Sequence, residues 1–254
     1  MLTDSQRDRI TVVLTQPRNP LNIGAAARAM TNFGFSRLTV VAPYEPHWRE
    51  AKSAIGAEEL LQDAKRAEGL AEAVADCTLV IGVSSLAHRN PEQPAVSLPG
   101  LAPRVAHELA RNGRIALVFG PEKRGLTRDD LALCHLLVEI PTNAHQPSMN
   151  LGQAVAVCLY ELAVRAGGSK SAGQQVRESA AKSTDSGTAA TTADLSLVAS
   201  VVAETMQASN YSPAAMQKAN RHDLDLLLRR LALTRRDARR ILGLFRRILW
   251  RLKH

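Results

Sequence analysis

The sequence predicts an α/β fold, in which a parallel sheet is flanked by helices. Three observations lead to this prediction. Short apolar runs rich in β-branched residues recur along the first 140 residues, these runs are continuous rather than alternating, and helical patterns lie between them. Continuous apolar runs are typical of strands that are buried on both faces, as they are in parallel sheets. With 45% apolar and 22% charged residues, the composition is that of an ordinary globular protein.

The expected elements follow one another in a regular order. The apolar runs predict strands at 10–14, 38–41, 77–83, 115–119 and 136–140. Helical patterns lie at 69–76 and 126–134, and a long, mostly apolar helix is expected over 150–166. Parallel strands need crossover connections, which are usually helices, so this alternation agrees with a parallel sheet.

The composition changes sharply after Ala166. Residues 167–195 are rich in Gly, Ser, Ala and Thr and have almost no large apolar side chains. Such a segment cannot bury enough apolar surface to offset the entropy lost on ordering, so we expect a flexible linker here. The chain therefore divides into an α/β domain over 1–166, a linker over 167–195 and a small all-helical extension over 196–254.

The C-terminal extension carries the charge of the chain. From Glu204 to His254 there are twelve Lys and Arg residues against four Asp and Glu, a surplus equal to the net charge of +8. Segments 222–233 and 234–252 have the periodicity of amphipathic helices with arginine-rich outer faces, and Thr234 with Asp237 predicts a capping box. This pattern has two interpretations, a surface for a polyanionic partner or a solvated helix surface.

Several classes of protein are disfavoured. No run approaches the roughly 18 apolar residues of a membrane span, and the N-terminus lacks the apolar core of a signal peptide, so a cytoplasmic protein is expected. Cys77, Cys134 and Cys158 form no C-x-x-C pair, which predicts reduced thiols and no zinc site. The histidines lack ligand spacing, so we expect no metal. A G-x-G-x-x-G fingerprint is missing, which argues against a nucleotide-dependent oxidoreductase.

The first segment of interest is "NPLNIGAAARAMTNFG", which begins at Asn19 after a strand. Asn22 is expected to cap a helix and Gly34 to end it. Arg28 lies about 140° around the helix from Ile23, off the apolar face, so it can point into a cleft at the carboxyl end of the sheet. The alternative is an ordinary helix with one exposed Arg.

Two further loops follow strands. In "LVFGPEKRGLT" (117–127), the glycines allow close approach of backbone to a ligand, and Glu122 is either an exposed turn residue or a group that orients Arg28. In "EIPTNAHQPSMNLGQAV" (139–155), a helix is expected to start near Asn150, with Ser148 as a candidate N-cap. An apolar side chain such as Met149 in a polar loop suits a flat adenine ring.

Taken in order, these three segments resemble the signature motifs of the SPOUT superfamily, in its TrmH-like branch of RNA ribose 2′-O-methyltransferases. The resemblance covers roughly residues 8–166. The linker and the basic extension resemble the TrmJ type, which methylates nucleotide 32 (C or U) in the anticodon loop of tRNA. The resemblance implies a deep trefoil knot in the C-terminal part of the sheet domain and S-adenosylmethionine (S-adenosyl-L-methionine) as cofactor without a metal. It also implies a homodimer in which the Arg of one subunit reaches the cofactor site of the other.

The resemblance also implies roles for particular residues. The catalytic set is Arg28, Asn22, Glu122, Ser148 and Asn150, in which Asn22 and Glu122 would hold Arg28, and Arg28 would position the target ribose and its phosphate. The cofactor would be bound by Val83, Ser84, Ser85, Gly120, Ile140, Pro147, Ser148, Met149 and Asn150. The tRNA phosphates would be bound by Arg229, Arg230, Arg235, Arg236, Arg239, Arg240, Arg246 and Arg247.

Two alternatives stay open at this point. The same chemistry could act on another tRNA position or on ribosomal RNA. A protein of another class, a non-catalytic RNA-binding protein, would keep the fold and lose the reaction.

Overall fold

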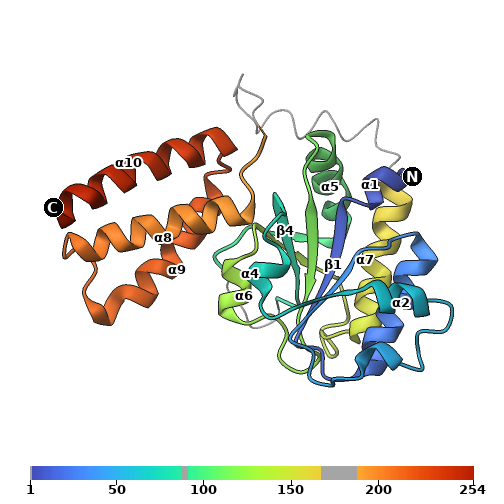
Figure 1. Cartoon of the computed structure of the whole chain (residues 1–254). Coiled ribbons are helices and arrows are strands. Elements are labelled where there is room, and N and C mark those ends of the chain that lie inside the picture. Colours follow the sequence, from blue (N-terminus) through green and yellow to red (C-terminus); the bar gives the residue numbers. More distant parts are fainter. Residues whose placement is uncertain (1, 87–90, 167–187) are drawn as a thin grey trace.

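The computed structural model describes residues 2–86, 91–166 and 188–254 (Figure 1). Seven parallel strands form one sheet in the order β3-β2-β1-β6-β4-β7-β5. The strands are β1 (Ile10–Thr15), β2 (Leu38–Val41), β3 (Lys65–Ala67), β4 (Leu79–Val83), β5 (Ala95–Ser97), β6 (Ile115–Phe119) and β7 (Leu136–Glu139). All five predicted strands and their parallel pairing are confirmed. The sequence prediction missed β3 and β5, which have three residues each and lie at the two edges of the sheet.

Helices cover both faces of the sheet. In the sheet domain, which we define as residues 2–166, they are α1 (Asp4–Arg7), α2 (Pro20–Phe33), α3 (Glu58–Asp63), α4 (Leu70–Ala73), α5 (Leu101–Ala110), α6 (Arg128–Ala132) and α7 (Leu151–Arg165), with 3-10 turns at Trp48–Glu50 and Leu98–Gly100. The predicted long helix is confirmed as α7, whereas the patterns at 69–76 and 126–134 form only the short helices α4 and α6.

The alternation of side chains along each strand divides the core into two layers. Val12 and Leu14 of β1 face the layer that α2, α5 and α7 cover, and Val13 between them faces the layer beside α4 and α6. The two layers lie on opposite sides of the sheet in Figure 1. Helices α2 and α7 pack so closely that a Cβ at Gly152 would lie 2.7 Å from the Cβ of Ala25.

Three longer helices form the C-terminal extension, which we define as residues 188–254. They are α8 (Thr192–Ala208), α9 (Gln217–Arg230) and α10 (Arg235–Lys253), with a 3-10 turn at Ala214–Met216. Helix α8 lies between the other two and shares an apolar core with both. The predicted capping box of Thr234 and Asp237 at the start of α10 is confirmed.

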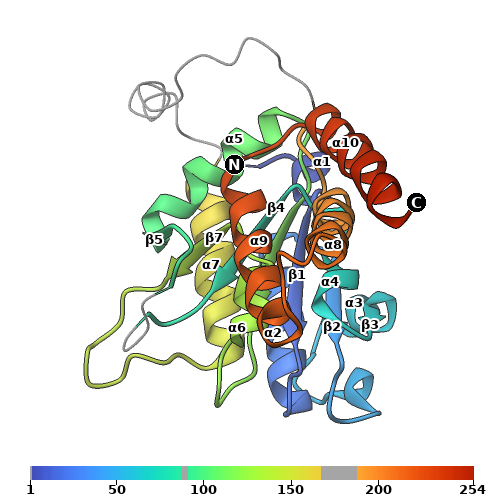
Figure 2. The ribbon, with the colours of Figure 1, turned by 90° about the vertical axis from the view of Figure 1, so that its left-hand side faces the viewer.

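The extension is attached to the α4 and α6 side of the sheet domain (Figure 2). The backbone N–H of Thr192 donates to the carbonyl of Cys77 at 2.9 Å, and the N–H of Ala193 donates to Ala75 at 3.0 Å. The predicted boundary at residue 196 is wrong, because Thr191 already caps α8. The rest of the predicted linker, 167–187, lies outside the described residues.

Candidate functional site

Three polar side chains from distant parts of the chain form a hydrogen-bonded row. Nδ2 of Asn22 donates to Oε1 of Glu122 at 2.7 Å, and Nδ2 of Asn150 donates to Oδ1 of Asn22 at 2.9 Å. Oδ1 of Asn150 also accepts from the N–H of Gly152 at 3.0 Å, at the start of α7. The row therefore joins the start of α2, the loop after β6 and the start of α7.

Two of the expected helix caps are wrong, and the reason explains this row. The N-cap of α2 is Asn19, which accepts from the N–H of Leu21 at 3.0 Å and is followed by Pro20 at the first helical position. Asn22, in the first turn of the helix, is thereby available to Glu122. The N-cap of α7 is Asn150 rather than Ser148. The predicted end of α2 at Gly34, with φ of 73°, is confirmed.

The row stabilises the ionised form of Glu122. Partial burial raises the pKa of this carboxyl, but the hydrogen bonds that it accepts from the Asn22 side chain and from backbone N–H groups outweigh burial, so its pKa lies below the ordinary value. Two of these donors are the N–H groups of Arg18 and Asn19, each at 3.3 Å. Glu122 therefore fixes the turn that leads into α2.

A cavity of about 300 Å³ opens at the carboxyl ends of β4, β6 and β7. Open α/β sheets bind ligands at this edge. Its lining includes eight of the nine residues expected to bind a cofactor, namely Val83, Ser84, Ser85, Gly120, Ile140, Pro147, Ser148 and Met149, and also Glu122. Asn150 does not line the cavity, because its side chain caps α7 and binds Asn22.

The same loops contribute lining residues that the sequence interpretation missed. They are Phe119, Pro121, Lys123, Arg124, Gly125, Thr142, Leu151 and Ala154. Most of these residues could have been found from the sequence, because they lie next to a predicted residue in the same short loop. The basic pair Lys123 and Arg124 is the informative addition, since it supplies positive charge to the lining of the cavity.

Gly120 is required by the shape of the loop after β6. A Cβ at this position would lie 2.3 Å from the carbonyl carbon of Gly125 and 2.3 Å from the backbone nitrogen of Leu126. Gly125 itself has φ of 63°, in the left-handed region that favours glycine. The loop thus folds back on its own start, and backbone rather than side chains forms this part of the cavity wall.

Arg28 lies apart from the cavity of its own chain. Its side chain is exposed and does not line the cavity. Six residues separate it from Asn22 on α2, which places the two about 120° apart around the helix. Within one chain, Asn22 and Glu122 bind each other and Asn150, so the expectation that they hold Arg28 stays a prediction for a homodimer.

The thiols and one imidazole are buried and unreactive. Cys77, Cys134 and Cys158 are free cysteines, and burial raises their pKa values to about 11, 12 and 12. Burial, and then the charge of Arg229, lowers the pKa of His135 to about 3. In the described ranges 2–86, 91–166 and 188–254, no three His, Cys, Asp or Glu residues are grouped to hold a metal ion, and no helix is long and apolar enough to cross a membrane.

A family model described as the SpoU rRNA Methylase family matches residues 9–160. The chain belongs to this family. Similar proteins include the tRNA (cytidine/uridine/adenosine-2′-O-)-methyltransferase TrmJ of Pseudomonas aeruginosa, with 41% identity over 156 residues, which are 61% of this chain and 60% of that protein. The tRNA (cytidine-2′-O-)-methyltransferase TrmJ of Methanocaldococcus jannaschii is 38% identical over 156 residues, 60% of this chain and 66% of that protein. Each match spans less than two thirds of the relative's length.

A solved structure resembles nearly the whole chain. The crystal structure of TrmJ from Z. mobilis ZM4 matches with a TM-score of 0.78 and 28% identity, over 94% of this chain and 98% of that chain. The sheet domain makes up a smaller part of the chain than the 94% that is matched. The similarity therefore extends beyond the SpoU rRNA Methylase region into the C-terminal extension.

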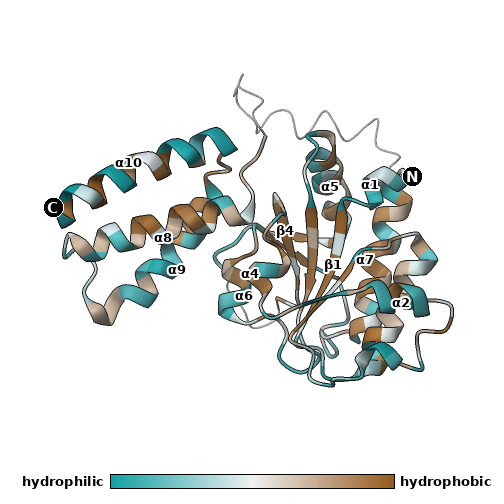
Figure 3. Cartoon of the chain, in the orientation of Figure 1, coloured by the Kyte–Doolittle hydropathy of each residue, from teal (hydrophilic) through white to brown (hydrophobic). Residues whose placement is uncertain are grey.

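The exposed arginines of the SpoU-family chain gather on α10. Arg235, Arg236, Arg239 and Arg240 surround an open hollow of about 410 Å³ together with Thr188. Arg246 and Arg247 are exposed further along α10, and Arg230 is exposed at the end of α9. In Figure 3 the ribbon of α10 alternates between hydrophilic and apolar residues, and Ala238, Ile241 and Phe245 are among those that pack in the core shared with α8. Seven of the eight predicted RNA-binding arginines are therefore accessible.

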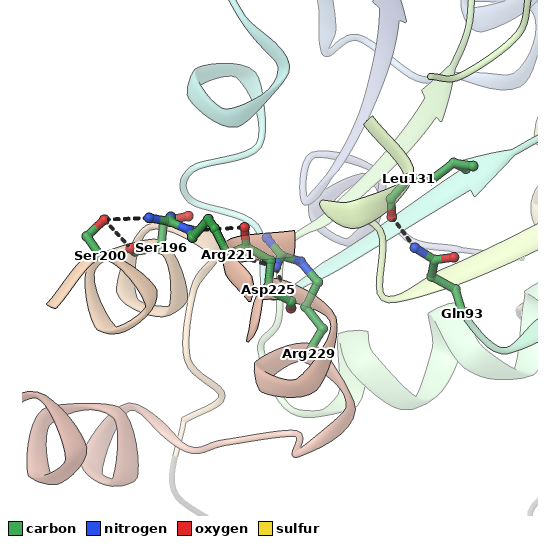
Figure 4. Close-up of polar contacts among 7 residues, drawn as sticks. All are labelled: Gln93, Leu131, Ser196, Ser200, Arg221, Asp225 and Arg229. Atoms are coloured by element: carbon green, nitrogen blue, oxygen red, sulfur yellow. Dashed lines mark hydrogen bonds and ion pairs between the residues drawn. The ribbon is translucent and has the colours of Figure 1, made fainter. Parts of the chain in front are cut away.

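Arg229 is the exception, and its expected contact with RNA phosphates is wrong. Its side chain is only 2% exposed, and its Nη1 donates to the carbonyl of Asp225 at 2.8 Å. The Asp225 carboxylate also pairs with Arg221, 3.1 Å away (Figure 4). The sequence places Arg229 beside Arg230 as if both were exposed, but α9 turns Arg229 inward, toward Cys134 and His135.

Proposed function

We propose that this protein transfers a methyl group from S-adenosylmethionine to the ribose 2′-hydroxyl of nucleotide 32 in the anticodon loop of tRNA. The observation that carries the proposal is the cavity at the carboxyl ends of β4, β6 and β7, with the Asn22–Glu122–Asn150 row beside it, in a chain of the SpoU rRNA Methylase family. Similarity to relatives and to a solved structure named TrmJ supports tRNA as the substrate.

The cavity fits the proposed cofactor. Its volume of about 300 Å³ is at the lower end of the range for small-molecule sites. Ile140, Met149 and Leu151 give an apolar wall for a flat ring, and the crowded backbone at Gly120 brings main-chain polar groups to the surface of the cavity. When bound, the cofactor supplies a methyl group already activated on a sulfonium.

The residues of the chain would then act by orientation. Holding a weakly nucleophilic hydroxyl in line can supply several kcal/mol, up to roughly 7–11 in ideal cases. Arg28 would bind the phosphate next to the target ribose and stabilise the developing alkoxide. A guanidinium keeps its proton in proteins, so Arg28 would serve as a cation. The hydroxyl proton would pass by way of the phosphate that Arg28 holds to water. Ser148, at the cavity, would hydrogen-bond the ribose or shape the loop.

A homodimer would bring Arg28 to the cavity of a second copy. Leu21 lies seven residues before Arg28 on the same face of α2 and is 51% exposed. On α7, Tyr160 and Val164 are 55% and 48% exposed, and the Tyr160 ring contacts Phe33 of α2 at 6.0 Å. These exposed apolar groups on α2 and α7 support an interface between copies on these two helices.

The proposal includes the knot and the location expected from the family resemblance. Strand β4 lies between β6 and β7 in the sheet, so the chain that leaves β6 must pass the end of β4 before it forms β7. This crossing follows the crowded loop at Gly120. This arrangement supports a trefoil knot through the loops that line the cavity. The buried free thiols support a reducing, cytoplasmic location.

Ribosomal RNA, the alternative substrate, has one observation in its favour, because the matching family is described as the SpoU rRNA Methylase family. The basic extension and the similarity to TrmJ over most of the chain favour tRNA. A non-catalytic RNA-binding protein, the rival from another class, would carry the same row of polar residues without methyl transfer.

The decisive experiment maps ribose methylation in RNA from a strain that lacks this protein and from the strain complemented with wild type or Arg28→Ala. We expect the 2′-O-methyl group at tRNA nucleotide 32 to disappear and to return only with wild type. Purified Arg28→Ala should still bind S-adenosylmethionine, because Arg28 does not line the cavity of its own chain. Loss of methylation at another site would correct the substrate, and unchanged methylation at every site would contradict the proposal.

A further inference from the structure

The exposed face of α10 combines arginines with one aromatic residue. At 100° per residue, Arg235, Arg239 and Arg246 form one row along the helix, and Arg236, Arg240, Arg247 and Arg251 form a second row about 100° away. Gly243 and Trp250, seven residues apart, lie between the two rows. Trp250 is 57% exposed. A tryptophan so placed is unusual, because this residue is highly buried on average.

Neighbouring groups hold the indole ring in position. The His254 imidazole stacks on it with the ring centroids 5.2 Å apart and the planes at 16°, and Nδ1 of His254 lies 3.0 Å from the carbonyl of Trp250. The guanidinium of Arg251 lies 6.0 Å from the ring centroid. Lys253 pairs with Glu204 of α8 at 2.5 Å, which fixes this end of α10 on the extension. The ring is thus presented to solvent in a defined orientation.

The surface around Gly243 is accessible to an extended ligand. A Cβ at this position would meet nothing within 4 Å, so the surface between the arginine rows is open there. An extended polyanion can approach the helix closely along this line, with arginines on both sides and the indole ring further along it.

We propose that Trp250 is a base-stacking residue, and that α10 binds an unpaired stretch of RNA, with its phosphates between the arginine rows and one base on the indole ring. This inference rests on the proposed function and deepens it by naming how the extension holds the substrate. Positive grooves with interleaved aromatic rings are the common means of binding single-stranded nucleic acid, since each base offers a π-face. Sequence-specific and single-stranded RNA recognition relies on the same stacking.

A membrane surface is the other polyanion that a basic amphipathic helix can bind, and a test with anionic vesicles separates it from RNA. Binding in the membrane interface requires a free apolar face. Part of the apolar face of α10 is covered, because Ala238, Ile241 and Phe245 pack in the core shared with α8, whereas Leu244, Ile248 and Leu252 stay 58%, 39% and 45% exposed.

Fluorescence of the full-length protein can test the proposal. The sequence has two tryptophans, and Trp48 is only 1% exposed, so a soluble quencher such as acrylamide reaches Trp250 selectively. A single-stranded oligouridylate should protect Trp250 from acrylamide, and an abasic oligonucleotide of equal length should not. Protection by vesicles of anionic lipid without protection by oligouridylate would overturn the proposal.

Affinity measurements provide the second arm. Trp250→Ala should weaken binding of oligouridylate roughly tenfold, the scale of one base stack, and leave binding of the abasic oligonucleotide unchanged. Trp250→Phe should restore most of the loss. Tyr211→Ala is the matched control, since Tyr211 is an aromatic residue that is 73% exposed but lies outside α10. If Trp250→Ala weakened binding of oligouridylate and of the abasic oligonucleotide equally, or weakened neither, the stacking role would be overturned. Methyl transfer to tRNA by the wild type is measured separately, and its absence would contradict the proposed function without deciding the role of Trp250.

Discussion

Asn22 and Glu122 lie 100 residues apart in the chain, yet the amide of one donates to the carboxylate of the other at 2.7 Å. This bond joins the first helix after β1 to the loop after β6, and Asn150 extends it to α7. The row fixes three of the loops at the sheet edge where the cavity opens. A residue of this row can therefore influence catalysis by positioning the loops, without contacting the substrate.

Glu122→Gln should lower the free energy of unfolding by about 1 kcal/mol, because a neutral amide accepts these hydrogen bonds more weakly and the site is partly exposed. The folded-state pKa of Glu122 lies below the ordinary value of 4.5. Its contribution to stability is therefore complete above about pH 4.5 and is lost as the pH falls through the folded pKa. Denaturant unfolding of both proteins over this range checks the prediction. Glu45→Gln, at an exposed loop position, is the control. A difference in unfolding free energy between wild type and Glu122→Gln that persists in acid would contradict the prediction.

Gly120→Ala should disturb the cavity more than the rest of the fold. The added Cβ would lie 2.3 Å from backbone atoms of Gly125 and Leu126, so the loop must move. Overpacking of this kind costs about 1–3 kcal/mol, and we expect cofactor affinity to fall at least roughly tenfold. Thermal unfolding and calorimetric titration with S-adenosylmethionine measure the two effects. Gly69→Ala has open space around its Cβ and should bind as the wild type does; similar affinity of Gly120→Ala would refute the prediction.

Arg229→Met should change the free energy of unfolding by less than about 1 kcal/mol. Nε and Nη2 of Arg229 are buried without a hydrogen-bond partner among the described residues, and Asp225 keeps its pair with Arg221 when Arg229 is replaced. The reciprocal change, Asp225→Ala, leaves a buried cation without its carboxylate and should cost about 3 kcal/mol. Urea unfolding compares the two variants. The assignment fails if Arg229→Met is the more damaging change.

The double variant Arg246→Gln/Arg247→Gln should make tRNA binding less sensitive to salt. Each phosphate contact contributes roughly 0.7–0.9 to the slope of log K against log salt concentration, so loss of two contacts lowers the slope by about 1.4–1.8. Filter binding over a range of salt concentrations provides the slopes. Arg229→Met should retain the wild-type slope, since its side chain is 2% exposed. An unchanged slope in the double variant would remove these arginines from the interface.

The sequence was sufficient for the elements whose signal is local. The buried strands of the sheet centre and the long apolar helix α7 were predicted within two residues, because continuous apolar runs and helical periodicity identify them. Strands β3 ("KRA") and β5 ("AVS") lack this signal, since their places at the sheet edges come from pairing with neighbours already in position.

The cavity lining agrees better with the residues expected from the sequence than the geometry of the polar row does. Eight of the nine cofactor residues that the family resemblance implies line the cavity, and eight further lining residues were missed. Residue type and position after a strand singled out the three loops. They were not enough to choose between Asn19 and Asn22 as the cap of α2, because both are competent and the presence of Glu122 decides between them. The inward turn of Arg229 similarly depends on Asp225 and on the docking of α9, neither of which adjacent residues reveal.

The position of β1 has a consequence for how the protein is made. Strand β1 pairs with β6 through residues such as Leu14 and Phe119, and α2 buries Ile23 and Met30 in the core that it shares with α7. A ribosome adding roughly 5–20 residues per second leaves these apolar surfaces without partners for several seconds. Contacts this distant in sequence also form slowly. We therefore expect nascent chains that stop before α7 to bind chaperones or to aggregate, so that translation must pass residue 165 before the sheet domain can fold.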